Sequence, residues 1–356
     1  MIAAQRPYVS FVLATHNRRA VVMRTLSHLP ACGLERRNYE VIVVDNASTD
    51  GTSEAVRPEV DVLIRRRGNA GSCAKAFGVT RARGQYIVFL DDDSFPRPGS
   101  VDRMLRRFEA DQNLAAAGFA VHLPDGQLEG SALPGVFIGC GVGLRADALR
   151  MVGGLDRTFF MQAEEYDLSF RLVAAGWKVA VFDDLQVDHL KTSHARANDR
   201  VTYCDIRNNL RVVARYLPSP YFEVYRQDWR QRYGWLAERN RQRRAFEHGA
   251  RAGHWRSLIE RQTYRRHRLS IAMAEQFFCW DLIEQKMSAL AQGGVQQVVF
   301  ADLGKNVFAF HRAAKQVGID VLAIGDDRFA APGRCYRGIA VQPLDDVLGL
   351  RADAMV

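Results

Sequence analysis

The residues most able to do chemistry are three consecutive aspartates, Asp91, Asp92 and Asp93, which follow the apolar run from Tyr86 to Leu90. This run is short and rich in β-forming residues, which is typical of a buried strand. Three carboxylates at its end concentrate negative charge that a nearby cation must neutralise. Hard divalent cations such as Mg²⁺ or Mn²⁺ bind carboxylate oxygens and share their remaining coordination positions with substrate phosphates. A solvated acidic turn is the simpler alternative, and the buried run before the aspartates argues against it.

A second pair of carboxylates, Glu164 and Glu165, follows about 70 residues later. Two neighbouring carboxylates do not ionise independently, so one of them can have the raised pKa that suits a general base. Acids in the first turn of a helix also interact favourably with the helix dipole, which is the structural alternative for this pair. His189 and His194 lie further on, and a lone histidine is more often structural than a ligand.

Four strands are expected in the first 90 residues, and helical patterns separate them. Their apolar runs lie at residues 8–14, 41–44, 62–64 and 86–90. Strands that alternate with helices at this spacing favour a parallel α/β sheet. A polar loop follows each strand, at residues 15–18, 45–52, 65–71 and 91–93. Turn formation explains any one of these loops, but ligands of open α/β sheets bind beyond the carboxyl ends of the strands, so the four loops together predict one shared cleft.

Five short motifs occur in order along the first half of the chain. They are Thr15-His16-Asn17-Arg18, Asp45-Asn46-Ala47-Ser48-Thr49-Asp50-Gly51, Gly68-Asn69-Ala70-Gly71, Leu90-Asp91-Asp92-Asp93 and Glu164-Glu165-Tyr166-Asp167-Leu168. This ordered set resembles the family 2 glycosyltransferases, which are inverting enzymes with the GT-A fold. The resemblance covers roughly residues 8–195, just over half of the chain.

The resemblance implies how a nucleotide-sugar donor would be held. Asp45 would hydrogen-bond the nucleotide base, in a pocket that Thr15 and His16 also line. The other implied donor contacts are Gly68, Asn69 and Gly71, in the loop beside the nucleotide, and Asp91 and Asp92, at the ribose and diphosphate. The resemblance leaves the sugar and the base of the nucleotide open.

The resemblance also implies a metal site and a catalytic base. Asp93 would ligate Mn²⁺ or Mg²⁺, and His189, which lies 24 residues after Glu165, would ligate the same ion, in preference to His194. Glu165 matches the base that deprotonates the acceptor hydroxyl for attack on the anomeric carbon. Many family members carry Asp at this position, so Glu164 stays open as the alternative.

The positive charge of the chain is concentrated in one segment. The formal net charge is +9, but residues 200–270 alone contain 17 arginines and 6 acids, so the rest of the chain sums to −2. Arginines interleaved with aromatic residues suit an anionic membrane surface or a polyanionic acceptor, and amphipathic helices with a solvated arginine face are the alternative. No nucleic-acid-binding motif accompanies the charge, so nucleic acid is not an expected partner.

The last 60 residues resemble half of a Rossmann-like domain. Strands are expected at 298–301 and 321–324 with a helix between them, and the segment 352–356 reads as a strand just beginning, so this domain looks cut short. Its first loop keeps one glycine, Gly304, of the GxGxxG pattern, which favours a structural or assembly role over dinucleotide binding.

These observations predict three regions in an α/β protein. Residues 1–200 would form a GT-A type catalytic domain with a mostly parallel central sheet. Residues 201–292 would form an Arg-rich helical region, and residues 293–356 a small Rossmann-like α/β domain.

The six cysteines are scattered, and there is neither a secretory signal nor an apolar run of about 20 residues, so we expect a reduced, cytoplasmic protein. Peripheral contact with the inner membrane surface and homo-oligomer formation both stay open.

The expected function is transfer of a sugar from a nucleoside-diphosphate-sugar to a hydroxyl group of a glycan or lipid-linked acceptor. Single displacement needs no nucleophile on the protein, and no Gly-x-Ser-x-Gly elbow is present. A nucleotidyltransferase is one alternative, but that class usually has a glycine-rich basic loop after the first strand, and residues 15–18 do not form one. A non-catalytic nucleotide-sugar-binding protein is another, although it would be expected to have lost Asp93 or both glutamates.

Overall fold

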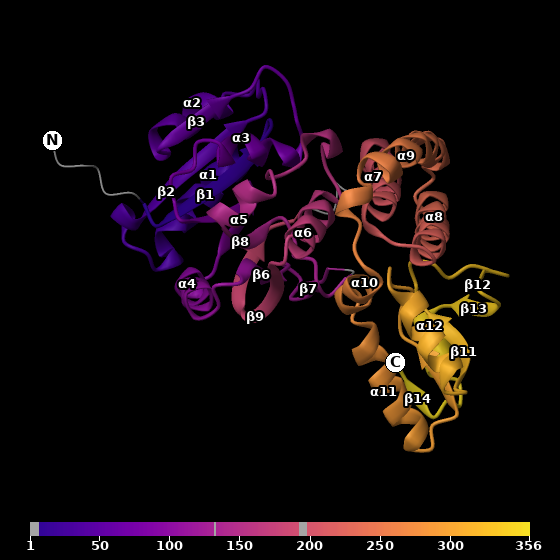
Figure 1. Ribbon diagram of the computed structural model, residues 1–356. Coiled ribbons are helices and arrows are strands. Elements are labelled where there is room, and N and C mark those ends of the chain that lie inside the picture. Colours follow the sequence, from indigo (N-terminus) through magenta and orange to yellow (C-terminus); the bar gives the residue numbers. More distant parts are fainter. Residues whose placement is uncertain (1–6, 132, 192–197) are drawn as a thin grey trace. The chain divides into compact units, whose positions relative to one another are not determined.

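The computed structural model describes residues 7–131, 133–191 and 198–356, and the chain divides into two compact units, residues 1–196 and 197–356. Figure 1 draws the first unit in indigo through magenta to rose, and the second from rose through orange to yellow. The first unit is an α/β domain, and the second combines long helices with a small sheet. Within the described ranges, no helix is both long enough and apolar enough to cross a lipid bilayer.

The first unit begins with four parallel strands, in the spatial order β3-β2-β1-β4. They are β1 (Val9–Thr15), β2 (Tyr39–Asp45), β3 (Val62–Arg65) and β4 (Tyr86–Asp91). Thr15 at the end of β1 lies opposite Asp45 at the end of β2, and Ala14 lies opposite Asp91. This register aligns the carboxyl ends of the strands, so the polar loops after them share one edge of the sheet, as in other open α/β sheets.

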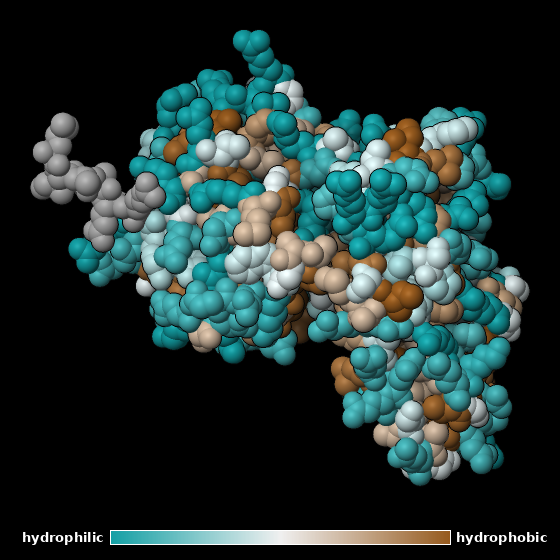
Figure 2. Space-filling view, in the orientation of Figure 1, coloured by the Kyte–Doolittle hydropathy of each residue, from teal (hydrophilic) through white to brown (hydrophobic). Residues whose placement is uncertain are grey.

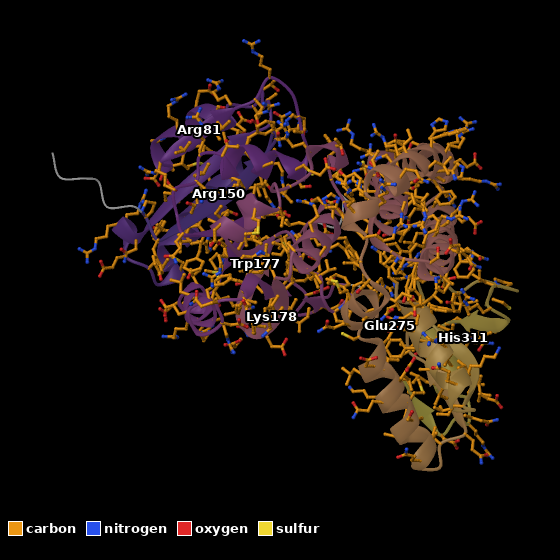
Figure 3. The ribbon with its side chains drawn as sticks, in the orientation of Figure 1. Arg81, Arg150, Trp177, Lys178, Glu275 and His311 are labelled. Carbon is orange, nitrogen blue, oxygen red and sulfur yellow. The ribbon has the colours of Figure 1, made fainter. Side chains whose placement is uncertain are left out.

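The sheet continues beyond β4 with strands of mixed direction. They are β5 (Ser94–Pro96), β6 (Leu114–His122), β7 (Leu128–Glu129), β8 (Gly141–Arg145) and β9 (Lys178–His189). β8 runs antiparallel to both β4 and β6, whereas β9 runs parallel to β6. β9 begins at Lys178, labelled in Figure 3, and ends at His189, which lies opposite Ser94 of β5. The long strand β9 therefore returns His189 to the segment that follows the three aspartates.

Helices cover both faces of this sheet. They are α1 (Arg19–His28), α2 (Thr52–Val56), α3 (Lys75–Val79), α4 (Ser100–Ala110), α5 (Ala146–Met151) and α6 (Glu164–Ala174). Alternate residues of β1 point to opposite faces, so Phe11 packs in one apolar cluster with residues of α1 and α4, while Val12 packs in another with residues of α5 and α6. The α/β prediction is confirmed. Helix α3 is short and ends at Val79.

Among its described residues, the second unit contains five helices that precede a small α/β part with a mostly parallel sheet. The helices are α7 (Asp199–Tyr216), α8 (Tyr221–Arg239), α9 (Arg243–Thr263), α10 (Ile271–Phe277) and α11 (Trp280–Gln292). The small α/β part consists of β10 (Gln297–Phe300), α12 (Val307–Gln316), β11 (Asp320–Gly325), β12 (Cys335–Tyr336), β13 (Ile339–Gln342), α13 (Leu344–Leu348) and β14 (Ala354–Met355). The segment expected to start a strand near the C-terminus forms β14, which pairs in parallel with β10.

Helix α8 binds the loop that follows β10. The indole Nε1 of Trp229 donates to the carbonyl oxygen of Lys305 at 2.9 Å, and the Tyr225 hydroxyl donates to Asn306 Oδ1 at 2.8 Å. The helical region and the small α/β region thus form one compact unit, while their treatment as two separate domains stays a prediction.

A buried ion cluster joins α7 to α9. Glu260 of α9 accepts from Arg211 Nη2 at 2.8 Å and from Arg215 Nη2 at 2.8 Å, both on its Oε1 atom. All three residues are buried. Burial acts to raise the pKa of Glu260, but the hydrogen bonds from Arg215 and Arg211 outweigh it and hold the pKa below its ordinary value. Glu260 is therefore a buried anion that pairs with two buried guanidinium groups.

Glu260→Gln should destabilise the second unit by roughly 3 kcal/mol, because it removes the negative charge that accepts hydrogen bonds from two buried guanidinium groups. Urea unfolding of the full chain, followed by a probe of helix content, would measure the change. Glu247→Gln is the matched control on the same helix, since Glu247 forms an exposed i,i+4 pair with Arg243 and should contribute less than about 1 kcal/mol. Equal effects of the two variants would contradict the assignment.

The same cluster predicts a pH dependence. The folded-state pKa of Glu260 lies below its unfolded value of about 4.3, so the stabilisation is complete above that pH and is lost as pH falls through the folded-state pKa. The difference in unfolding free energy between wild type and Glu260→Gln should therefore be constant from about pH 7 to pH 5 and shrink below about pH 4. Unfolding titrations at each pH would check this, and a difference that stays the same at acid pH would contradict it.

Candidate functional site

The carboxyl edge of the first sheet brings Arg18, from the loop after β1, against the aspartates after β4. Arg18 Nη1 donates to Asp92 Oδ1 at 2.6 Å and its Nη2 donates to Asp93 Oδ2 at 2.8 Å. Thr15 Oγ1 donates to the other oxygen of Asp92 at 2.7 Å. Burial raises the pKa of Asp92 to about 6, because Arg18 and Thr15 offset only part of the lost hydration. The Arg18 guanidinium therefore bridges two neighbouring carboxylates.

His189, at the end of β9, faces Asp93 from the other side. Its Nε2 atom lies 3.2 Å from Asp93 Oδ1, and its Nδ1 atom lies 3.1 Å from Glu129 Oε2. Burial acts to raise the pKa of Asp93 and to lower the pKa of His189. Hydrogen bonds from His189 and Arg18 nevertheless hold the pKa of Asp93 well below its ordinary value, and hydrogen bonds with Asp93, Cys140 and Glu129 raise the pKa of His189 to about 12. Glu129 orients the imidazole ring as carboxylates do behind metal-binding histidines.

Asp91 is the most exposed of the three aspartates and pairs with a buried lysine. Lys75 Nζ, at the start of α3, donates to Asp91 Oδ1 at 2.5 Å and to the carbonyl oxygen of Gly139 at 2.8 Å. Burial acts to lower the pKa of Lys75, but Asp91 outweighs it and the pKa lies above its ordinary value. Lys75 is therefore a fixed positive charge beneath a carboxylate that reaches solvent.

The donor atoms at this edge fit a hard divalent cation. One ligand atom each from Asp91, Cys140 and His189 lie within 4.8 Å of one another, and Asp93 is in direct contact with His189. Burial raises the pKa of the Cys140 thiol, so it stays protonated, and soft sulfur is a poor ligand for Mg²⁺ or Mn²⁺. The aspartate carboxylates and the His189 imidazole are therefore better candidate ligands than Cys140, and which aspartate would contact the ion stays a prediction.

The first donor loop is held together by Asp45. The Asp45 carboxylate is buried, accepts from the backbone N–H of Ser48 at 3.0 Å, and also accepts from the hydroxyl of Ser53. His16 is exposed beside this loop, with its Nδ1 atom 2.8 Å from the carbonyl oxygen of Asn46. The structure thus shows Asp45 anchoring the loop after β2, and its contact with a nucleotide base stays a prediction.

The second donor loop is tied to the first through Asn46. Its amide nitrogen donates to the carbonyl oxygen of Gly71 at 3.1 Å, while Asn69 Oδ1 accepts from the N–H of Gly71 at 2.7 Å. Gly71 has φ +64°, and a Cβ atom there would lie 2.2 Å from the carbonyl oxygen of Phe160. Only glycine fits this position without strain. Gly68 differs, because a Cβ atom there would meet nothing within 4 Å.

The second donor loop also contacts the start of α6. The hydroxyl of Ser72 donates to Glu164 Oε1, and the N–H of Cys73 donates to the carbonyl oxygen of Phe160 at 3.1 Å. Within the described part of the chain, the buried Oε2 atom of Glu164 has no hydrogen-bond partner, and burial raises the pKa of this carboxyl. Glu165, the next residue, is half-buried. Both glutamates thus lie at the helix terminus that approaches the donor loop.

The backbone just before α6 is strained. Phe160, Gln162 and Ala163 all have positive φ angles, between +64° and +69°. Such angles cost non-glycine residues on the order of 1 kcal/mol or more, and they cluster where the surrounding structure fixes a functional group. The strained segment sets the direction in which α6 presents its first residues.

The structure therefore brings Thr15, Asp91, Asp92, Asp93 and His189 together, and it links the loops of Asp45, Asn69 and Gly71 to the start of α6. His194 lies outside the described residues. The sequence analysis assigned no role to a second set of residues at this edge, and these are Arg18, Asn46, Ser72, Lys75, Glu129 and Cys140. Arg18 and Asn46 lie within two of the five motifs, so the sequence could have indicated them as site residues. Lys75 and Glu129 lie in none of the motifs.

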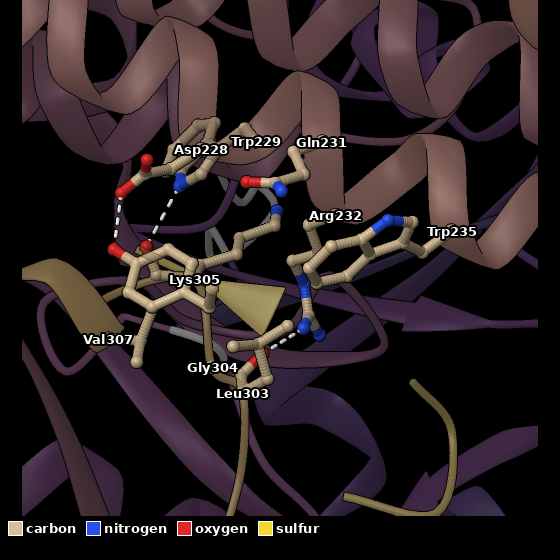
Figure 4. A pocket seen from close by; sticks show the side chains of 10 residues that line it. Asp228, Trp229, Gln231, Arg232, Trp235, Leu303, Gly304, Lys305 and Val307 are labelled. Atoms are coloured by element: carbon tan, nitrogen blue, oxygen red, sulfur yellow. Dashed lines mark hydrogen bonds between the residues drawn. The ribbon is translucent and has the colours of Figure 1, made fainter. Parts of the chain in front are cut away.

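The second unit contains a separate small pocket between α8 and the loop after β10 (Figure 4). Trp229, Arg232, Gly304 and Lys305 are among the residues that line it. Its space suits about one water molecule, so we assign no ligand to it. The candidate functional site is the carboxyl edge of the first sheet.

Comparisons with solved structures identify the fold. A mannosyltransferase from Pyrobaculum calidifontis, described in complex with GDP-Man and Mn²⁺, is similar with a TM-score of 0.52 at 17% identity, over 88% of this chain and 87% of that one. TarS 1-349 of S. aureus, described in complex with UDP-GlcNAc, is similar with a TM-score of 0.51 at 13% identity, over 73% and 90%. The α/β architecture of the first unit is thus the GT-A fold of these glycosyltransferases.

Comparisons of sequence show which proteins part of the chain resembles. The succinoglycan biosynthesis protein ExoO of Rhizobium meliloti (strain 1021) is 36% identical over 110 residues, which are 29% of this chain and 30% of ExoO. The matches span between 30% and 60% of the length of the curated relatives. Residues 10–133 match the model of glycosyl transferase family 2. This match covers 124 of the 356 residues, so the first unit has the GT-A fold and contains a segment similar to the family 2 glycosyltransferases.

Proposed function

We propose that this chain transfers a sugar from a nucleoside-diphosphate-sugar to a hydroxyl acceptor by a metal-assisted single displacement with inversion. The observation that carries the proposal is the group formed by Asp91, Asp92, Asp93 and His189 at the carboxyl edge of a family 2 domain. The complexes of the two structural neighbours, with GDP-Man and Mn²⁺ and with UDP-GlcNAc, support a nucleotide-sugar as the donor. Whether the base is guanine or uracil stays open.

The ion and the diphosphate would share the aspartate edge. Asp93 and His189 would hold Mn²⁺ or Mg²⁺, while Asp91 and Asp92 would position the ribose and diphosphate. When bound, the ion supplies positive charge that stabilises the departing diphosphate. Arg18 lies at the same edge, and its guanidinium can form bidentate contacts with phosphate oxygens. Asp45, Thr15 and His16 would surround the base, and the loop of Gly68, Asn69 and Gly71 would lie beside the nucleotide.

Glu165 would act as the general base. Its carboxylate takes the proton of the acceptor hydroxyl as that oxygen attacks the anomeric carbon, and the bond from this carbon to the diphosphate oxygen breaks. The proton ends on Glu165 and the electron pair on the nucleoside diphosphate. Glu164 is the alternative base, because its Oε2 atom is buried with no partner among the described residues and its pKa is raised. Its contact with Ser72 supports a positioning role, in which Glu164 fixes the donor loop.

The acceptor is proposed to be a surface polysaccharide or another glycoconjugate, including a lipid-linked glycan. The name of the relative ExoO, a succinoglycan biosynthesis protein, supports a polysaccharide product. A lipid-linked acceptor would require the protein to work at the cytoplasmic face of a membrane, and we propose that it binds there peripherally. Oligomer formation is left open.

The donor site should bind a nucleoside diphosphate only together with a divalent cation. UDP or GDP with Mn²⁺, at about a hundred times the dissociation constant, should raise the Tm by roughly 5 °C or more, since binding to the native state alone adds about 2.7 kcal/mol. Asp93→Asn should abolish the shift, whereas Asp102→Asn, in an exposed pair on α4, should keep it. No stabilisation of the wild type by any nucleoside diphosphate with metal would contradict the proposed donor site.

Glu165→Gln should separate donor binding from chemistry. The amide cannot accept the hydroxyl proton, so turnover should fall by about 10²–10⁴-fold while the Mn²⁺-dependent Tm shift stays at the wild-type value. Release of nucleoside diphosphate from the donor that gives the largest Tm shift would measure turnover. Glu164→Gln is the companion variant, and we expect it to weaken donor binding more than it slows turnover of bound donor. Full activity of Glu165→Gln together with loss of turnover in Glu164→Gln would move the base to Glu164.

A further inference from the structure

The outward face of α9 carries a ridge of large apolar side chains. Trp255, Leu258 and Ile259 have exposed fractions of 68%, 52% and 65%, and the spacing i, i+3, i+4 places them together on one face of the helix. Figure 2 shows brown apolar surface over α9 within largely teal surroundings. Single exposed apolar residues are ordinary on a protein surface, whereas adjoining large ones mark a contact site.

The opposite face of α9 explains why the large residues point outward. Gly249 and Gly253 are buried against α7, and a Cβ atom at Gly253 would lie 3.0 Å from the Cα atom of Arg207. Ser257, one turn further, donates to the carbonyl oxygen of Leu210 at 3.0 Å. Small residues thus let α9 approach α7 closely, and the orientation of the helix within its own unit is fixed. Trp255, Leu258 and Ile259 are exposed and take no part in the packing of α9 against α7.

Positive charge predominates around this ridge, and the exposed acid of the same helix, Glu247, is paired with Arg243. Arg251 and Arg256 flank it along α9, and Arg265 and Arg266 follow the end of the helix, all of them exposed. Between residues 248 and 267 the sequence contains a single acid, Glu260, which is buried against two arginines of α7. The face therefore combines an apolar centre with a cationic rim.

We propose that this face of α9 docks the protein on an anionic lipid surface. Trp255, Leu258 and Ile259 would enter the boundary between headgroups and acyl chains, and the flanking arginines would contact lipid phosphates, as in interfacial amphipathic helices. A second copy of the chain is a poorer match, because a self-complementary contact would bring two cationic rims together. A nucleic acid would match the arginines but would leave the apolar centre unpaired. This proposal names the surface for the membrane contact proposed above, and it can hold whether or not the protein transfers a sugar.

Vesicle binding by the full-length chain tests this surface. The wild type should co-sediment with vesicles of phosphatidylglycerol and phosphatidylcholine, bind pure phosphatidylcholine vesicles at least about tenfold more weakly, and lose affinity as salt is raised. The triple variant Trp255→Gln, Leu258→Gln, Ile259→Gln should bind the anionic vesicles at least about tenfold more weakly. Leu282→Gln on α11, where the exposed fraction is 50%, is the matched control and should bind as the wild type does.

Several outcomes would overturn the proposal. One is wild-type binding by the triple variant at an unchanged unfolding midpoint, and another is equal binding to anionic and neutral vesicles. A wild-type dimer that the triple variant dissociates, with no binding of either protein to vesicles, would assign the ridge to self-association instead. Mn²⁺-dependent donor binding is measured on the same samples. Its absence in the wild type would count against the proposed transfer, while the vesicle result alone would decide the role of α9.

Discussion

Three carboxylates stand side by side at the end of β4, and burial of Asp92 and Asp93 removes water that would otherwise stabilise their charge. Like charges repel one another, and cations placed against buried carboxylates favour their ionised forms. The protein supplies these cations from three separate elements: Lys75 from α3, Arg18 from the loop before α1, and His189 from the end of β9. Much of the architecture of the first unit follows from this need. The aligned register of the parallel strands places the aspartates at one edge of the sheet. Strand β9 runs beside β6 and ends at His189, which lies next to Asp93.

The same constraint explains how the site can respond to a ligand. Arg18 already pairs with Asp92 and Asp93, so it competes with a metal ion for their oxygens. A nucleoside diphosphate would offer the guanidinium phosphate oxygens in exchange, which makes binding of ion and diphosphate mutually favourable. The loop of Gly71, held against Phe160, carries Ser72 to the terminus of α6. The proposed donor loop is therefore in direct contact with Glu164, one of the two candidate bases.

The sequence was informative where the chemistry is local. Apolar runs that end in polar loops predicted the parallel strands and the α/β fold, which the structure confirms, and they placed the aspartates at a strand end. The residues that neutralise and orient these groups were not predicted, because their partners lie far away in sequence. Glu129 is 60 residues from His189, Ser72 is 92 residues from Glu164, and only the fold brings each pair together. Pairing between distant segments also determines β9, which pairs with β6 and ends at His189. The roles of Glu165 and Asp93 stay predictions.

The central claim is that the aspartate edge holds a divalent cation and a nucleoside diphosphate together. Electron paramagnetic resonance of free Mn²⁺ measures this directly, because the signal of the hydrated ion falls when the protein binds it. UDP or GDP is added, and the loss of signal that the nucleotide causes without protein is subtracted. The remaining loss should correspond to about one ion per chain for the wild type, and it should be small for Asp93→Asn. The same small loss for both proteins with every nucleoside diphosphate would contradict the account.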